Sequence, residues 1–142
     1  MRKSIVLIGA VLALATPATA ESCGMAPIPP DIPNASALAG KTTDDAHSFV
    51  LASLKAVRTW QGQLSPFREC LQNAANVQKA AAADATASGD KGKADAASAQ
   101  MNTLQAAYDK TVDTETKVAT DFNTLHTAYC KMGDGLTGCP KK

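Results

Sequence analysis

The chain has 142 residues, with 14 basic and 13 acidic side chains and a formal net charge of +1. This length suits one domain, and the near-neutral charge gives no electrostatic reason to bind nucleic acid or an anionic membrane surface. We therefore expect a single domain and exclude nucleic acid as a partner.

The first twenty residues have the organisation of a secretory signal peptide. A positive start at residues 2–3, an apolar run at 5–15 and the small-residue motif Ala18-Thr19-Ala20 follow in order. The apolar run is too short to span a membrane, and no later stretch approaches that length. We expect cleavage at Ala20-Glu21, export to the periplasm or secretion beyond it, and no membrane insertion afterwards.

Residues 21–42 form a distinct Pro-rich segment. Its prolines, at positions 27, 29, 30 and 33, block helix formation and favour an extended path. Such a segment is either a flexible leader or a strap laid over the domain, and Cys23 favours the strap because it offers a point of attachment. We expect Met25, Ile28 and Ile32 to fill an apolar groove on the helices.

A first long helix is predicted from Thr43 to about Ala87, preceded by a capping hydroxyl at Thr42 or Thr43. Apolar residues recur every seven positions in two adjacent rows: Val50, Val57, Leu64 and Leu71, beside Trp60, Phe67, Ala74 and Ala81. Pro66 kinks or breaks a helix, but Gly62, four residues earlier, obstructs the proline ring least. One kinked helix is therefore favoured over two helices broken at 62–66.

A second long helix is predicted from about Lys93 to Lys131, after a turn at residues 88–92 with Gly89 in the left-handed conformation. Its rows are Ala97, Leu104, Thr111, Val118, Leu125 and Met132, beside Met101, Tyr108, Glu115, Phe122 and Tyr129. Long helices joined by a tight turn pack antiparallel. We predict an all-α, coiled-coil-like helical hairpin at residues 43–132, an extended Pro-rich N-terminal strap and a C-terminal tail at 133–142, tied by disulfides.

Four cysteines allow three pairings, which the hairpin geometry narrows. With the turn near Gly89, Cys70 lies about 40 Å from Cys130 along the hairpin, beyond the reach of a disulfide. Cys139 follows Cys130 too closely to reach Cys70, whereas the Pro-rich segment is long enough to bring Cys23 there. We predict Cys23–Cys70 and Cys130–Cys139. The alternative, Cys23–Cys130, leaves Cys70 to link two chains.

A cysteine at 23, a proline run, a helix with Lys55-Ala56-Val57 and then Cys70-Leu71 follow one another along the chain. This order resembles a loose set of small exported bacterial proteins of uncharacterised function, over roughly residues 23–75. The resemblance supports the Cys23–Cys70 pair and implies no activity, cofactor or partner.

Catalytic motifs are not evident, so we expect neither an enzyme nor a bound cofactor. The sequence has no C-x-x-C, no glycine-rich phosphate loop and no paired carboxylates. His47, His126 and Asp121 fall near the open end of the hairpin, and imidazole and carboxylate are ordinary metal ligands. No H-x-x-x-H or E-x-x-H pair accompanies them. Solvent-facing histidines are therefore favoured, and a metal site at these three residues is the alternative.

The function we expect is binding of another protein or self-association in the cell envelope, as in a chaperone or adaptor. The region 74–99 is rich in alanine, which contributes little burial, so the helix pair leaves apolar surface for a partner or a homodimer to cover. A seam residue such as Leu104 is then expected to support self-association. The alternatives are a periplasmic protein that binds a small ligand or metal at the open end, and a structural spacer.

Overall fold

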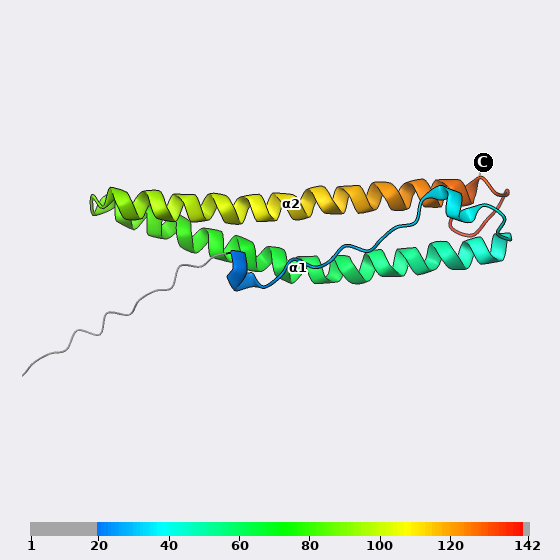
Figure 1. The fold of residues 1–142 in the computed structure, drawn as a ribbon, viewed down its shortest axis with the longest axis horizontal. Helices are drawn as coiled ribbons and strands as arrows, with labels where there is room; N and C mark the ends of the chain where they lie inside the picture. Colours follow the sequence, from blue (N-terminus) through cyan, green and yellow to red (C-terminus); the bar gives the residue numbers. More distant parts are fainter. Residues whose placement is uncertain (1–19, 141–142) are drawn as a thin grey trace, which may run out of the picture.

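The chain folds into two long antiparallel helices that lie side by side (Figure 1). Helix α1 covers Thr43–Ala87 and helix α2 covers Lys91–Cys130, and the 3₁₀ helices η1 (Ala20–Cys23) and η2 (Ala35–Leu38) precede them. The structure is a computed structural model that describes residues 20–140. Within these residues there is no strand, and no helix has the length and apolar character needed to cross a membrane.

The expected signal peptide, apart from Ala20, lies outside the described residues. The Pro-rich segment, the hairpin and the C-terminal tail up to residue 140 lie within them.

Helix α1 begins where the sequence predicts and continues unbroken through Pro66. Thr42 caps the helix: its side-chain oxygen accepts a hydrogen bond from the Asp45 backbone N–H at 3.2 Å, and its hydroxyl donates to the Asp45 carboxylate at 2.8 Å. The alternative of two helices broken at 62–66 is wrong. The ring of a helical proline crowds the backbone four residues earlier, and Gly62 is the residue that adapts most easily there.

A tight turn at residues 88–90 joins the helices. Gly89 has a φ of 74°, in the left-handed region that glycine adopts without a steric penalty. The Asp90 carboxylate then accepts a hydrogen bond from the Lys93 backbone N–H at 3.1 Å, which caps α2. Because Asp90 is the cap, α2 begins at Lys91, two residues before the predicted start.

The two helices meet along the predicted rows, which we term the seam. Buried row residues are Val50, Val57, Leu64 and Leu71 on α1, and Ala97, Leu104, Thr111, Val118 and Leu125 on α2. Val57 packs in one cluster with Val118, and Leu71 in another with Leu104. Ala81, the last residue of its row, is exposed. The sevenfold spacing therefore identifies the contact faces correctly.

A polar cross-link joins the helices within the seam. The Arg68 guanidinium donates from Nη1 to a Glu115 carboxylate oxygen at 2.6 Å and from Nε to Thr111 Oγ1 at 2.7 Å. Gln61 Nε2 donates to the other Glu115 oxygen at 2.8 Å. The Arg68 hydrogen bond, and after it the Gln61 hydrogen bond, lowers the pKa of Glu115 below its usual value because both stabilise the charged carboxylate.

The Pro-rich segment runs along the helices from the middle of the hairpin to the open end, where α1 begins and α2 ends (Figure 1). The Cys23–Cys70 disulfide fixes its start, with the two Cα atoms 5.7 Å apart. Trp60 Nε1 donates to the Pro27 carbonyl oxygen at 3.1 Å, and Ile32 packs against two clusters of the seam. The segment is therefore a strap, and the flexible-leader alternative is wrong.

Two apolar side chains of this segment point away from the helices. Met25 is 93 % exposed and Ile28 is 85 % exposed, so the prediction that they fill a groove is wrong. At this level the Pro-rich segment contacts α1 through the Pro27 carbonyl, which is directed at the Trp60 indole. Since the backbone makes the contact here, the neighbouring Ile28 side chain is left facing solvent.

The second disulfide, Cys130–Cys139, closes a loop in the C-terminal tail, with Cα atoms 5.5 Å apart. Both bonds match the geometric prediction, and the alternative Cys23–Cys130 pairing is wrong. Neither bond joins α1 to α2: the first ties the Pro-rich segment to α1, and the second ties the tail to α2.

Replacing Cys23 and Cys70 by serine should release the start of the Pro-rich segment and expose Trp60, which is only 3 % exposed. Trp60 is the only tryptophan, so its fluorescence emission should shift to longer wavelength. The free energy of unfolding should fall by about 2–4 kcal/mol. The matched control, serine at Cys130 and Cys139, should leave the emission unchanged. An unshifted emission in the first variant would show that the disulfide does not hold the segment on Trp60.

Glu115 should make the stability depend on acid pH. Because its pKa is lower in the folded chain, its contribution is complete above the unfolded-state pKa and is lost as pH falls through the folded value. Glu115→Gln should therefore reduce the loss of unfolding free energy below about pH 4.5, measured by urea titration. Asp121→Asn, which removes only an exposed ion pair, is the control and should change stability little. An acid profile identical to that of the parent chain would contradict the prediction.

Candidate functional site

The structure does not bring the three predicted metal candidates together. His47 and His126 line one cavity at the open end, but Asp121 does not. The Asp121 carboxylate instead pairs with Lys117 Nζ at 2.6 Å, one turn earlier on α2. The favoured expectation of solvent-facing histidines is also wrong, since both imidazoles are half-buried. His47 Nδ1 lies 3.0 Å from the Tyr129 hydroxyl.

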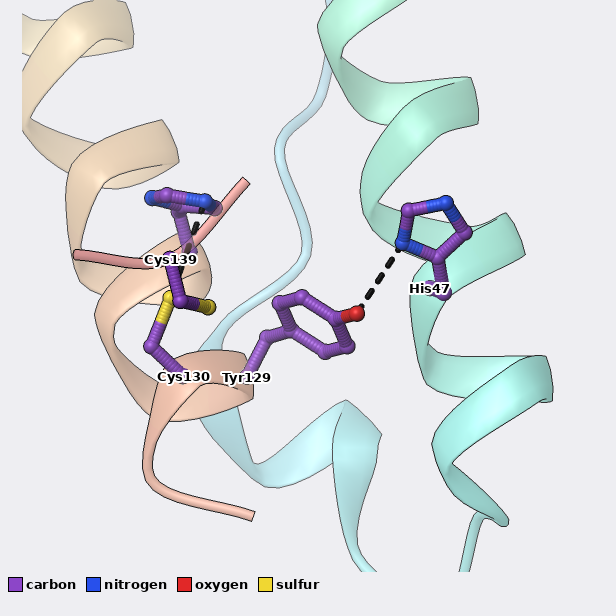
Figure 2. The surroundings of a disulfide bond; sticks show 5 residues. His47, Tyr129, Cys130 and Cys139 are labelled. Atoms are coloured by element: carbon purple, nitrogen blue, oxygen red, sulfur yellow. Dashed lines mark hydrogen bonds between the residues drawn. A yellow bond between two sulfur atoms is a disulfide. The ribbon is translucent and has the colours of Figure 1, made fainter. Parts of the chain in front are cut away.

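The cavity at the open end has a volume of about 290 Å³ and lies between α1, α2 and the C-terminal loop. Figure 2 shows Tyr129 reaching from α2 toward His47 on α1, with the Cys130–Cys139 disulfide on the other side of the tyrosine. The other residues that line the cavity are mostly apolar: Val50, Leu51, Leu54, Phe122, Thr137 and Gly138. Ligand pockets usually measure about 300–1,000 Å³, so this cavity suits only a small ligand.

A second group of possible metal ligands lies at this end and was not predicted from the sequence. Among the described residues, one group of three His, Cys, Asp or Glu side chains has ligand atoms within 4.8 Å of one another, namely His126, Cys130 and Cys139. His126 and Cys130 are four residues apart on α2, so they share one helix face, and Nε2 lies 3.7 Å from Sγ. The His-x-x-x-Cys spacing indicates this arrangement in the sequence, but a cysteine paired in a disulfide is not a metal ligand, and Cys130 is predicted to be paired.

The tail passes beside His126 at a glycine. Gly138 has a φ of +84°, and a Cβ at this position would lie 3.7 Å from His126 Nε2. A residue with a side chain would be strained here because of the positive φ, although a Cβ would have room beside the imidazole. Gly138 therefore helps to place the neighbouring Cys139 sulfur beside His126.

The exposed part of the Pro-rich segment forms the other candidate site. Met25 and Ile28 project from it, and a hollow lies on each side. One hollow, of about 360 Å³, is lined by residues that include Pro27, Leu64 and Phe67, and the other, of about 470 Å³, by residues that include Ala52 and Ala56. We term Met25, Ile28 and these two hollows the strap surface. Apolar groups dominate it, and Trp60 lies at its base between the hollows.

No protein-family model matches the chain. Comparisons with curated proteins and with solved structures give no match either. The resemblance of residues 23–75 to small exported proteins therefore stays an expectation that rests on the motifs alone.

Tyr129→Phe keeps the buried ring and removes the hydroxyl that contacts His47. The free energy of unfolding should fall by about 0.5–1.5 kcal/mol, the contribution of one hydrogen bond. The free energy of unfolding is measured by urea titration. Leu125→Ala, in the same cluster, leaves a cavity and should lower this free energy by about 2–5 kcal/mol, so it serves as the reference for a large effect. An unchanged stability in Tyr129→Phe would show that the His47 contact contributes nothing in solution.

Proposed function

We propose that this is an exported, chaperone- or adaptor-like helical protein of the cell envelope that acts by binding another protein through the strap surface. The observation that carries the proposal is the exposure of Met25 and Ile28 on a backbone that is fixed in place. Export is supported by the signal-peptide pattern and by two disulfides, a feature of proteins in oxidising compartments.

The strap surface suits binding because its backbone is held before a partner arrives. The Cys23–Cys70 disulfide and the Trp60–Pro27 hydrogen bond lie on either side of Met25 in the sequence, and prolines restrict the backbone that follows. Ordering a flexible segment on binding costs free energy, and a segment already ordered avoids that cost. Full burial of an exposed Met or Ile side chain contributes about 1.5–3 kcal/mol.

The seam does not offer such a surface. Leu104 is 1 % exposed and packs with Leu71 inside the hairpin, so in the closed chain its side chain is not available to a second copy. A charge at this position would disrupt the hairpin and would not report on association. Even in the alanine-rich half, Ala74, Ala85 and Ala97 are buried between the helices. The two most exposed large apolar side chains, Met25 and Ile28, lie on the Pro-rich segment, whereas those exposed on the helices, such as Val77, are less exposed.

Photo-crosslinking in the producing cell tests the proposal. A photoreactive amino acid in place of Ile28 should give a specific crosslinked product, whereas the same residue in place of Val77 should not. Val77 is the matched control because it is also apolar and 59 % exposed, but it lies on α1 outside the strap surface.

The identity of the product separates two forms of the proposal. A crosslink to a different protein identifies the partner, and a crosslink between two copies identifies self-association through the same surface. Ile28→Asp should remove a crosslink formed from position 25 without lowering helix content, measured by circular dichroism. Equal products from positions 28 and 77, or none from position 28, would contradict the proposal.

A further inference from the structure

We infer that His126, Cys130 and Cys139 form a second site, which binds a thiophilic divalent cation such as Zn²⁺ when the Cys130–Cys139 disulfide is reduced. The three ligand atoms lie within 4.8 Å of one another. Zinc binds sulfur at about 2.3 Å and imidazole nitrogen at about 2.0–2.1 Å, so ligands of one ion lie about 3.5–4 Å apart. The His126 Nε2 to Cys130 Sγ distance of 3.7 Å already meets this requirement.

Only the Cys139 sulfur has to move. It belongs to the C-terminal tail, outside any helix, so breaking the disulfide lets it separate from Cys130 without disturbing α2. His126 and Cys130 stay on one face of α2, held by the helix, and the tail is kept nearby by Leu136, which packs against the cluster at the open end. Three protein ligands leave a fourth tetrahedral position for water.

The other disulfide is a natural comparison. Cys23 and Cys70 offer the same two sulfurs, but among the described residues no third His, Cys, Asp or Glu ligand atom completes a group with them. Reduction of both disulfides therefore creates two dithiols, of which only Cys130–Cys139 has an imidazole in position. Zn²⁺ should therefore bind tightly at the Cys130–Cys139 dithiol and not at the Cys23–Cys70 dithiol.

The disulfide state and the zinc-bound state interconvert by thiol–disulfide exchange and loss or gain of two protons. A dithiol reductant attacks one sulfur of Cys130–Cys139, and its second thiol then resolves the mixed disulfide, leaving two protein thiols and an oxidised reductant. On binding Zn²⁺ the two thiols release two protons to solvent, and neutral His126 contributes a lone pair. A disulfide oxidant reverses the sequence: it takes two electrons, re-forms the Cys130–Cys139 bond and releases the ion.

Titration of the mature chain with Co²⁺, after full reduction by a phosphine, tests the site. Reduced wild type should bind one Co²⁺ per chain and show thiolate-to-cobalt charge-transfer absorption, and oxidised wild type should show none. The Cys23→Ser, Cys70→Ser variant should keep this absorption. The Cys130→Ser, Cys139→Ser variant should lose this absorption, although after reduction it has as many thiols as the Cys23→Ser, Cys70→Ser variant.

His126→Ala tests the imidazole. Loss of an outer partner of a metal ligand lowers metal affinity roughly 10–100-fold, so loss of the ligand itself should lower Co²⁺ affinity at least tenfold. His47→Ala removes the other histidine of the open end and should leave the affinity unchanged. A loss of affinity in His47→Ala equal to that in His126→Ala would overturn the proposed ligand set.

A second measurement covers the case in which full reduction loosens the fold. Zn²⁺ should slow alkylation of Cys130 and Cys139 relative to Cys23 and Cys70 in the same sample, measured by peptide mass spectrometry. Equal alkylation of the two pairs, or charge-transfer absorption that survives in the Cys130→Ser, Cys139→Ser variant, would overturn the inference. The result is independent of the strap surface, which shares no residue with this site.

Discussion

The pairing of α1 with α2 depends on apolar side chains that recur every seven residues, because neither disulfide joins the two helices. Leucine and valine at the seam positions exclude water in the half of the hairpin toward the open end, and alanine takes their place toward the turn. The Arg68–Glu115 pair fixes the helices to each other within the seam. A narrow contact between two helices buries little surface per residue. The Pro-rich segment adds burial where Ile32 and Leu38 pack against the seam toward the open end.

Much of this architecture follows from the sequence. The sevenfold rows predict the contact faces, Gly89 and Asp90 mark the turn, and Thr42 marks the start of α1. The disulfide pairing also follows, because a rigid hairpin fixes distances along its axis and excludes the wrong partners. These predictions succeed because helices have a fixed rise and period, so residue numbers translate into positions in space.

The details that sequence reasoning missed lie where no such period applies. The direction of Met25 and Ile28 depends on which carbonyl of the extended segment meets Trp60, and an extended proline-rich path has no register of its own. Arg68 lies outside the predicted rows, so the rows do not indicate that its guanidinium contacts Glu115 and Thr111 across the seam. The group of His126, Cys130 and Cys139 depends on the path of the tail, in which Gly138 adopts a positive φ.

The two candidate sites also differ in what controls them. The strap surface is held by the Cys23–Cys70 bond, so it needs an oxidising environment to keep its shape. The proposed metal site needs the opposite condition at Cys130–Cys139. The relative stabilities of the two disulfides therefore decide whether the strap surface and the metal site can exist together. A reductant that reached only the tail would open the metal site and leave the strap surface intact.

The arrangement of the covalent links has one more consequence. The Pro-rich segment is closed onto α1 and the tail onto α2, so only the peptide chain through Gly89 connects the two halves. The halves can therefore separate about this turn with both disulfides oxidised, once the apolar contacts of the seam, the Arg68–Glu115 ion pair and the packing of the Pro-rich segment are released. In an opened chain each helix presents its whole seam face, which is complementary to the other helix of any second copy. Reciprocal exchange of α2 between two chains would restore the same buried contacts in a domain-swapped dimer.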